Sequence, residues 1–433
     1  MWYEDIVFYQ IYTLNFCDVP KENNGVQEHR LDRVDDYIGY LKNLGIGGVY
    51  FNPVFSSDRH GYDTRDYKKI DERLGTNEEF RQTVAKIHEA GMKVVLDGVF
   101  NHVGRGFFAF RDVQKHKWES KYCNWFKIDF NGNSCYDDGF WYEGWEGHYE
   151  LVKLNLDNKE VQDYLLDSVR YWIDYFDIDG IRLDVAYLLP RWFMGMLSDF
   201  TKNLKSDFFL FGETLGDNQG YMFSEGKLDS ITDYPGYKGF WSGFNSYNMF
   251  EIAHTLKRNM FEMYRGRKLW TFLDNHDVDR IASKLQDREN LPVLFGLQLS
   301  LPGIPCIYYG SEWGQEGIKI QGQSDDILRP AIKTPYPNEL TDTIRKMISI
   351  RNHYSAMKCG TFDELRLTNR QYVFQRRYDA ERIIVILNID SNDSYVNFNA
   401  DAAEAEDLLS GNVIHFDNGC MAKSNSIMYL KVR

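Results

Sequence analysis

The chain has 433 residues, 43% of them hydrophobic and 16% aromatic, and a formal net charge of −14. This composition supports a large core, and the length exceeds that of one ordinary domain. The negative charge argues against nucleic acid as a partner, because phosphates would be repelled. The N-terminus has no basic region followed by an apolar core, and no stretch reads as a membrane span, so we expect a cytoplasmic protein without a membrane partner.

Six cysteines are scattered along the chain without a CxxC pair. This pattern is typical of free, mostly buried thiols in a reducing compartment, with a single Cys123–Cys135 bridge as the alternative. No Cys/His cluster has zinc spacing, so we expect no catalytic metal.

A strand–helix alternation begins at the N-terminus. Strands are expected at residues 6–12, 48–52 and 93–99, with helices at 33–44 and 78–90. Asn77 is expected to cap the second helix, and Gly91 to end it. This alternation is typical of a (β/α)8 barrel, an α/β fold.

The alternation stops between residues 103 and 157, which are rich in Gly, Asn, Asp and aromatic residues. Because a long irregular segment in a compact unit is normally functional, we interpret it as an inserted subdomain that walls one side of a cleft. Trp141 and Trp145 either line that cleft or fill the core of the insertion. The helix pattern resumes at Lys159.

Five further apolar runs complete the barrel. They lie near Gly180, Phe209, Leu228, Trp270 and Cys306. The catalytic barrel is therefore predicted to comprise residues 1–102 and 158–355. Beyond it, period-two runs such as YVFQRRY and RIIVILNI predict a C-terminal antiparallel β-sandwich over residues 356–433.

Four apolar runs stop at acids: Asp97, Asp184, Glu213 and Asp277. On a parallel barrel the carboxyl ends of the strands form the catalytic face. Cleavage of a glycosidic bond needs a proton donor for the leaving oxygen and a negative group at the anomeric carbon. Three converging acids, Asp184, Glu213 and Asp277, therefore predict a glycosidase site.

The neighbours of these acids suggest their roles. Arg182 precedes Asp184 by two residues, so on a strand both side chains point the same way, and the guanidinium would keep Asp184 ionised as a nucleophile. Glu213 has no basic residue beside it in the sequence and is predicted to be the protonated acid. Asp277 follows two hydrogen-bond donors and is predicted to hold substrate and stabilise charge.

Four motifs in order carry a resemblance to a known family. DGVFNH (97–102), GIRLDVA (180–186), GET (212–214) and FLDNHD (272–277) resemble the four signature regions of the α-amylase family, glycoside hydrolase family 13. HGYDTRDY, GHYELVKLN and YYGSEWG agree with it, and the resemblance covers roughly four fifths of the chain. It implies Asp184 as nucleophile, Glu213 as acid/base and Asp277 as transition-state stabiliser.

The resemblance also implies a set of substrate-binding residues. His102 and His276 would bind the sugar at the cleavage site, Tyr62 would stack on it, and Arg182 would orient Asp184. Asp97 is similar to a structural acid beneath the site, with substrate contact as the alternative reading. The remaining implied contacts are Asp325 and Arg329 on the next sugar outward and Tyr187 on the leaving side.

One position departs from many family members. Where they have an Asp that binds calcium together with the Asn at position 101, this chain has Lys153. We expect no cofactor, with the Lys153 ammonium near Asn101 taking the charge role of the ion. The alternatives are that Lys153 is a solvated surface residue, or that a calcium ion binds at Asn101.

The stretch LVKLN resembles MPKLN of cyclomaltodextrinases, neopullulanases and maltogenic amylases. Those enzymes usually carry an N-terminal β-domain, for which this chain has no room, and an Asn–Glu pair where it has Tyr187 and Leu188. The resemblance implies retaining cleavage of α-1,4 bonds in maltooligosaccharides and related α-glucans, with cyclodextrins and pullulan as further candidates. A transglycosylase is the first alternative, and a non-catalytic sugar-binding protein the second. We expect short oligosaccharides to be better substrates than starch.

Overall fold

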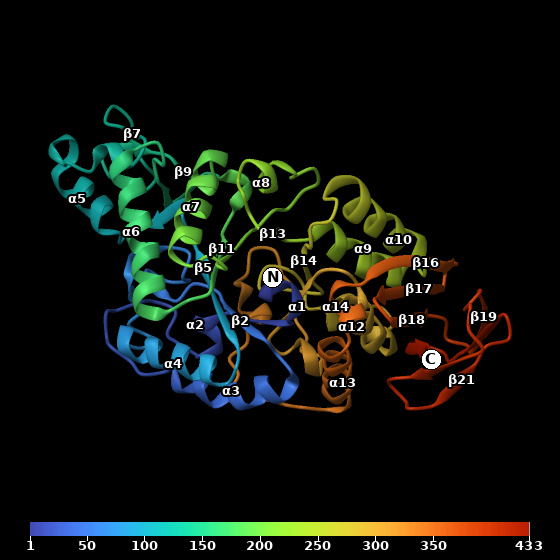
Figure 1. Cartoon of the computed structure of the whole chain (residues 1–433). Helices are drawn as coiled ribbons and strands as arrows, with labels where there is room; N and C mark the ends of the chain where they lie inside the picture. The colour runs from blue at the N-terminus through green and yellow to red at the C-terminus, as the bar shows by residue number, and fades with distance from the viewer. Residues whose placement is uncertain (433) are drawn as a thin grey trace.

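The computed structural model describes residues 1–432, and its centre is a ring of eight parallel strands (Figure 1). The order of pairing is β13–β12–β11–β5–β2–β1–β15–β14, and a parallel bridge between Thr232 and Trp270 joins the two ends of the sheet. This ring confirms the predicted (β/α)8 barrel. Its strands are β1 (Phe8–Ile11), β2 (Gly48–Phe51), β5 (Lys93–Gly98), β11 (Gly180–Leu183), β12 (Phe209–Gly212), β13 (Ser230–Ile231), β14 (Trp270–Phe272) and β15 (Ile304–Tyr308).

The inside of the barrel is filled by aromatic side chains rather than left as a channel. Phe209, Phe211 and Trp270 stack there, with the rings of Phe211 and Trp270 only 4.1 Å apart between centroids. The short helix α1 (Trp2–Asp5) adds Tyr3, which stacks on Phe209. Because this core is closed, access to the strand ends is only from the mouth.

An outer layer of helices buries one apolar face against the strands. In α3 the residues Val34, Tyr37, Leu41 and Leu44 recur at helical spacing and are buried, while Gly45 ends the helix at φ +91°. The main outer helices are α3 (Asp32–Leu44), α4 (Asn77–Glu89), α6 (Lys159–Phe176), α7 (Arg191–Leu204), α9 (Tyr234–Asn245), α10 (Met249–Lys257), α12 (Leu291–Ser300) and α13 (Glu339–His353).

One predicted helix cap is wrong. The N-cap of α4 is Thr76, whose hydroxyl accepts from the backbone N–H of Glu79 while the Glu79 carboxylate accepts from the backbone N–H of Thr76. This reciprocal pair satisfies two helix-end donors. Asn77 instead accepts from the backbone N–H of Ile70, tying the helix to strand β4 (Thr64–Ile70).

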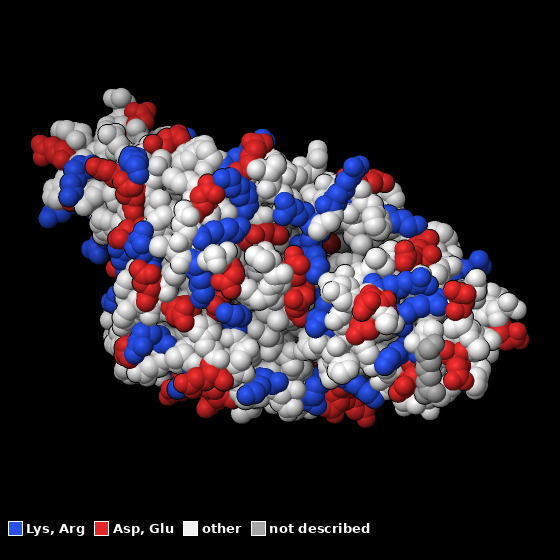
Figure 2. All heavy atoms as spheres, viewed as in Figure 1, with Lys and Arg blue, Asp and Glu red and all other residues white. Residues whose placement is uncertain are grey.

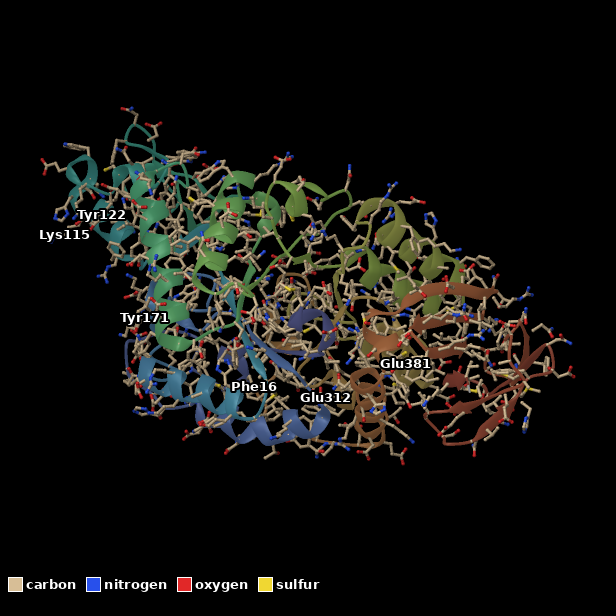
Figure 3. The ribbon with its side chains drawn as sticks, in the orientation of Figure 1. Phe16, Lys115, Tyr122, Tyr171, Glu312 and Glu381 are labelled. Carbon is tan, nitrogen blue, oxygen red and sulfur yellow. The ribbon has the colours of Figure 1, made fainter. Side chains whose placement is uncertain are left out.

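The insertion projects from one end of the barrel (Figure 1). The strand β10 (His148–Lys153) pairs with β6 (His102–Gly104) and β9 (Gly144–Trp145), which connects the insertion to the end of β5. The helix α5 (Phe108–His116) and the hairpin of β7 (Ile128–Asp129) and β8 (Trp141–Tyr142) lie further out, near Lys115 and Tyr122 in Figure 3.

The C-terminal unit lies at the opposite end of the molecule from the insertion (Figure 1). A six-stranded antiparallel sheet packs against a two-stranded one, with Ile384, Ile386 and Val396 in the core between them. Its strands are β16 (Thr361–Leu367), β17 (Gln371–Tyr378), β18 (Glu381–Asn388), β19 (Ser394–Asn397), β20 (Glu404–Asp407), β21 (Val413–His415), β22 (Gly419–Ala422) and β23 (Ser426–Val432). The period-two runs thus form the predicted antiparallel sheet.

Two buried arginines lie where this unit meets the barrel. Arg351 of α13 donates to the carbonyls of Leu299, Leu301 and Gly303 at the end of α12. Arg376 of β17 donates to the carbonyl of Ser300, and both side chains are fully buried. Backbone carbonyls rather than carboxylates therefore satisfy these two guanidinium groups.

The six cysteines form no disulfide. All six thiols are free, as predicted. Only Cys17, Cys306 and Cys420 are buried, so the prediction that most of the thiols are buried is wrong.

Acidic and basic side chains are interspersed over the face shown in Figure 2. Among residues 1–432 no helix has the length and apolar character needed to cross a membrane.

Candidate active site

The acidic side chains converge at the mouth because of the strand register. β11 ends at Leu183 and β12 at Gly212, and these two residues pair, so Asp184 and Glu213 emerge side by side. Asp97 lies inside β5, one residue before its end, where it pairs with Arg182 of β11. Asp277 follows the end of β14 by a short loop.

Arg182 is the centre of the charge network. Its Nη1 donates to Oδ1 of Asp184 at 2.9 Å and to both oxygens of Asp97 at 2.8 Å, while Nη2 lies 2.8 Å from Oε1 of Glu213. All four side chains are almost fully buried. The expectation that Glu213 lacks a basic partner is therefore wrong, because its partner comes from the neighbouring strand.

The residue after Asp184 supplies a second donor to Glu213. The backbone N–H of Val185 donates to Oε2 of Glu213 at 2.9 Å. Val185 has φ +40°, a left-handed conformation that β-branched residues rarely adopt. Both carboxylate oxygens of Glu213 thus accept an N–H group.

Burial is the main influence on protonation of this pair. It raises the pKa of Asp184 and of Glu213, Arg182 opposes both rises, and neighbouring carboxylates add to them. Two buried acids sharing one guanidinium hold a proton more readily than two isolated acids would. The pKa values of Asp184 and Glu213 are therefore shifted in the same direction, and they do not distinguish an ionised nucleophile from a protonated acid as the sequence predicted.

Asp277 lies in a different environment, with its side chain 37% exposed. Although burial works against it, the adjacent His276 ring and the Arg329 guanidinium hold the pKa of Asp277 well below its usual range. Nη2 of Arg329 donates to Oδ1 of Asp277 at 3.0 Å and to Oδ2 of Asp325 at 3.3 Å. Asp277 is thus a fixed negative charge at the mouth.

A hydrogen-bonded network lies beneath the mouth. The hydroxyl of Tyr62 donates to Oδ2 of Asp97 at 3.0 Å and lies 2.6 Å from Nε2 of His276. Nδ1 of His276 lies 2.9 Å from the amide nitrogen of Gln10. The rings of Tyr62 and His276 are nearly parallel, 5.7 Å apart. Asp97 therefore positions other side chains from below.

His102 presents an unpaired nitrogen. Burial lowers its pKa to about 3, so the ring is neutral. Its Nε2 is buried without a hydrogen-bond partner and lies 4.0 Å from Oδ2 of Asp184. A buried polar atom without a partner is costly in a stable structure and is often explained by a missing ligand group.

These side chains line a cleft of about 560 Å³. The structure brings the predicted residues Tyr62, His102, Asp184, Tyr187, Glu213, Asp277, Asp325 and Arg329 into its wall, whereas Asp97, Arg182 and His276 lie beneath it. Sequence reasoning missed His60, His148, Glu150, Leu215, Tyr234 and Lys319, which also line the cleft. His60 lies inside the HGYDTRDY motif, and His148 and Glu150 lie inside the GHYELVKLN motif, so these three had a local signal.

The two insertion tryptophans differ in position. Trp145 lines the cleft, with its ring 5.4 Å from that of His148 and 5.7 Å from that of His102. Trp141 lies outside it, 38% exposed, and donates to the hydroxyl of Tyr149. The strand β9 therefore brings an aromatic wall from the insertion to the mouth.

Lys153 lies opposite His102 in the pairing of β10 with β6, next to Asn101, and its ammonium pairs with a carboxylate. Its ammonium lies 2.6 Å from Oε1 of Glu143, within the insertion, while the Asn101 amide nitrogen lies 3.1 Å from Nδ1 of His102. Residues 1–432 contain no group of three or more His, Cys, Asp or Glu side chains arranged to hold a metal ion.

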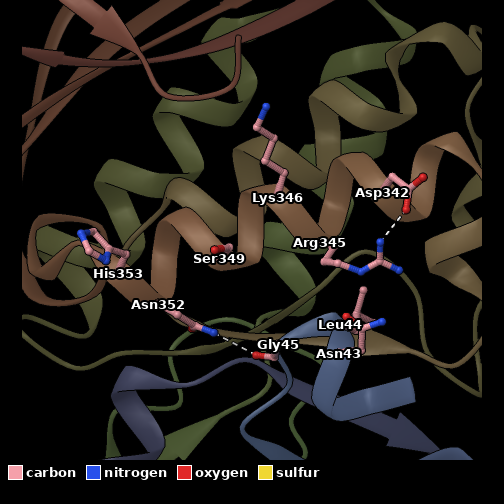
Figure 4. A pocket seen from close by; sticks show the side chains of 9 residues that line it. All are labelled: Asn43, Leu44, Gly45, Asp342, Arg345, Lys346, Ser349, Asn352 and His353. Carbon is pink, nitrogen blue, oxygen red and sulfur yellow. Dashed lines mark hydrogen bonds and ion pairs between the residues drawn. The ribbon is translucent and has the colours of Figure 1, made fainter. Parts of the chain in front are cut away.

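A separate cavity of about 620 Å³ lies away from the mouth, between α3 and α13 (Figure 4). Asn352 donates there to the carbonyl of Gly45, and Asp342 pairs with Arg345. None of the strand-end acids lines it, so we place the reaction in the cleft at the mouth.

Comparison with known proteins identifies the family of the chain. Residues 10–366 match the family described as "Alpha amylase, catalytic domain". The chain is 32% identical to a cyclomaltodextrinase of Thermoanaerobacter pseudethanolicus, covering 96% of this chain and 76% of that protein. It is 31% identical to a maltogenic α-amylase of Bacillus acidopullulyticus, covering 93% and 72%.

Solved structures give the same result. A cyclic α-maltosyl-(1→6)-maltose hydrolase from Arthrobacter globiformis aligns over the whole of both chains with a TM-score of 0.86 and 27% identity. The family match covers all four signature motifs and every acid of the site. The protein is therefore a member of the α-amylase family of glycoside hydrolases.

Proposed function

We propose that this protein hydrolyses α-1,4-glucosidic bonds of maltooligosaccharides with retention, through a covalent glucosyl–Asp184 intermediate. The observation that carries the proposal is the single guanidinium of Arg182 bonded to both Asp184 and Glu213 in a cleft that Asp277 also lines. A retaining mechanism needs a nucleophile and an acid/base about 5–5.5 Å apart, and two carboxylates sharing one guanidinium suit that separation.

In the first step an oxygen of Asp184 attacks the anomeric carbon while the bond to the leaving oxygen breaks. Oδ1 is held by Arg182, so Oδ2 is the attacking atom. Glu213 gives its proton to the leaving oxygen, which departs as a sugar hydroxyl. Because both oxygens of Glu213 accept N–H groups, proton donation requires that one of them exchange its contact for the leaving oxygen.

In the second step water attacks the same carbon from the side the leaving sugar occupied. Glu213 takes a proton from that water, the bond to Asp184 breaks, and the product keeps the α configuration. Asp277, held negative by Arg329, stabilises the oxocarbenium-like states before and after the intermediate. Two inversions at one carbon thus give retention.

The substrate contacts follow the positions of the side chains. Tyr62 and the unpaired Nε2 of His102 face the sugar being cleaved, and Asp325 with Arg329 hold the next sugar on the non-reducing side. Relatives named cyclomaltodextrinase and maltogenic α-amylase support α-glucan substrates. The proposal narrows this class to oligosaccharides of a few glucose units. We also propose a cytoplasmic location and a fold independent of calcium.

The first experiment follows maltohexaose hydrolysis by ¹H NMR in the first minutes. The α anomer is expected to appear first, and initial appearance of the β anomer would refute the mechanism. Asp184→Asn and Glu213→Gln are each expected to lower kcat by at least about 10³-fold with an unchanged melting temperature. Full activity of Asp184→Asn would show that Asp184 is not the nucleophile, and full activity of Glu213→Gln would show that Glu213 is not the acid/base.

A second experiment compares substrates per cleavable bond. We expect higher kcat/KM on maltohexaose than on soluble starch, and equal or greater efficiency on starch would overturn the preference for oligosaccharides. A transglycosylase is the alternative within the same site, because water and a second sugar compete for one intermediate. Products longer than the substrate, with little gain in reducing ends, would favour it.

A further inference from the structure

A pocket of about 460 Å³ lies where the insertion meets the barrel, and it shares no lining residue with the catalytic cleft. Its wall is built from the loop at residues 18–31, strand β4, the segment after β6 and helix α5. We call it the arginine pocket. Its lining side chains are Asn23, Asn24, Arg65, Arg105, Arg111 and Gln114, and two glycines complete the wall. Three guanidinium groups and three amides therefore face one space that no acid lines.

The arginine pocket gathers positive charge in a chain whose formal net charge is −14. Arg65 pairs with Asp58, and Arg105 bonds both oxygens of Asp138 at 2.8 Å, so acids outside the lining balance these two cations. Arg111 differs from them, because within residues 1–432 its guanidinium makes no ion pair and no hydrogen bond. The pocket thus has an excess of about one positive charge, on a side chain that is free to bind an anion.

The two paired arginines also keep donors for a ligand. A guanidinium has five N–H donors. Arg65 uses two of them within the protein, and Arg105 uses three. Cζ of Arg105 lies 3.9 Å from the ring centroid of Tyr136, and this stacking fixes the plane of the guanidinium. Together with Arg111, these side chains offer a set of unengaged N–H groups around one space.

We propose that the arginine pocket binds a phosphate monoester of a sugar. A phosphate dianion presents several acceptor oxygens, which guanidinium groups bind through paired N–H···O bonds. The amides of Asn24 and Gln114 can both donate and accept, as sugar hydroxyls do. A volume of about 460 Å³ falls in the range of small-molecule sites and exceeds the needs of a bare phosphate ion.

The pocket borders the segments that carry two residues of the catalytic cleft. Arg65 follows Tyr62 by three residues, and Arg105 follows His102 by three. Asp58 ties these segments together, because it pairs with Arg65 and accepts at 2.9 Å from the backbone N–H of the residue after Arg105. A ligand in the pocket therefore contacts both segments without competing with substrate for the atoms of the cleft.

The test measures binding to the whole protein by isothermal titration calorimetry, with glucose 6-phosphate, inorganic phosphate and glucose as probes. Glucose 6-phosphate is expected to bind with a Kd below about 1 mM. Inorganic phosphate should bind at least threefold more weakly, because it lacks the sugar contacts, and glucose at least tenfold more weakly, because it lacks the charge. The titration with glucose 6-phosphate is repeated on Asp184→Asn with excess maltohexaose, where an unchanged Kd is expected.

Two variants place the ligand in the pocket. Arg111→Gln removes the unpaired cation and is expected to weaken glucose 6-phosphate binding at least tenfold. Asn24→Asp keeps the acceptor for the backbone N–H of Val26 but adds a negative charge, so it should weaken binding by a similar factor. The matched control is Arg366→Gln on β16, an exposed arginine that also makes no ion pair within residues 1–432, and it should bind like the wild type. All three positions are exposed, so the melting temperatures should equal that of the wild type.

Wild-type affinity in both Arg111→Gln and Asn24→Asp would overturn the proposal. Displacement of glucose 6-phosphate by maltohexaose would also overturn it, because the ligand would then occupy the catalytic cleft. Equal affinities for glucose 6-phosphate and inorganic phosphate would replace it with a site for the bare anion. An affinity for glucose equal to that for glucose 6-phosphate would show that the pocket does not recognise phosphate.

Discussion

The backbone N–H of Val185 donates to Oε2 of Glu213 from a residue held at φ +40°. Left-handed backbone at a β-branched residue costs of order 1–3 kcal/mol and persists only where its surroundings enforce it. Here the same turn places Asp184 in the mouth and aims the next N–H at the second acid. The two acids are thus fixed relative to each other by one peptide unit as well as by Arg182.

Replacing Arg182 with lysine should reduce both activity and stability. A lysine ammonium is a compact charge that cannot bond two separated carboxylates and Asp97 at once. We expect kcat to fall at least about 10²-fold and the free energy of unfolding to fall by about 3–5 kcal/mol, the typical cost of leaving buried charges unpaired. Urea denaturation and steady-state kinetics measure the two effects.

The control for this variant is Arg376→Lys, a fully buried arginine at the contact with the C-terminal sheet. It should lower stability with little effect on kcat. Equal kcat losses in the two variants would show that the Arg182 effect is only structural.

Tyr187 lines the cleft close to the acid pair and is 3 residues beyond Asp184. If it meets the leaving sugar, it also meets the acceptor that competes with water. Tyr187→Ala should therefore lower the ratio of transfer products to hydrolysis products at least threefold, with total bond cleavage changed less. Product analysis at high maltotriose concentration measures this ratio, and a uniform loss of both products would argue against an acceptor role.

Lys153 gives a prediction about metal independence. Its contact with Glu143 is partly exposed, so Lys153→Met should cost no more than about 1 kcal/mol. If no ion contributes to folding, as proposed above, a chelator should leave melting temperature and activity unchanged. Lys127→Met is the matched control, because Lys127 also pairs with Glu143 but is 61% exposed. A marked fall in melting temperature with chelator would reveal a bound cation.

Glu312 makes stability depend on pH. It is fully buried near α13 (Figure 3), and Oε1 accepts from Tyr9 at 2.7 Å and from Tyr40 at 3.0 Å. Burial raises the pKa of Glu312 to about 7, although these hydrogen bonds oppose the rise. The folded state then holds its proton longer than the unfolded state, so stability falls as pH rises from about 4.5 to about 7.

Glu312→Gln removes this ionisation while keeping the shape. Between pH 5 and pH 8 the variant should gain on the wild type by roughly 2–3 kcal/mol at most in urea denaturation. Glu119→Gln, an exposed acid on the insertion, should show no such gain. Parallel pH profiles for wild type and Glu312→Gln would contradict the prediction.

The sequence predicted the barrel and its acids because both depend on local patterns. Buried strands read as apolar runs, and acids at their ends mark the mouth. Contacts across strands have no such signal. The bond from Arg182 to Glu213 depends on the pairing of β11 with β12, and the position of His60, Glu150 and Lys319 in the cleft depends on how separate loops meet. The φ of Val185 likewise follows from tertiary contacts rather than from propensity.

The Thr76 cap shows a different limit. Thr76 and Asn77 are both good capping residues, and only the reciprocal bond with Glu79 decides between them. The partner of Lys153 shows the same limit, because Glu143 comes near its ammonium only through the fold of the insertion.

The buried guanidinium groups of Arg351 and Arg376 affect whether the barrel and the C-terminal sheet can be produced as separate fragments. Arg376 of the sheet donates to the carbonyl of Ser300 on the barrel, and Arg351 of the barrel donates to the carbonyl of Met357 in α14 (Ser355–Cys359), just before the sheet. A fragment ending near residue 355 would lose the Met357 carbonyl that Arg351 binds, and an excised sheet would carry Arg376 without the Ser300 carbonyl. Exchanging the C-terminal strands for those of a relative would therefore require that the position of Arg376 still meet a free carbonyl at the end of α12.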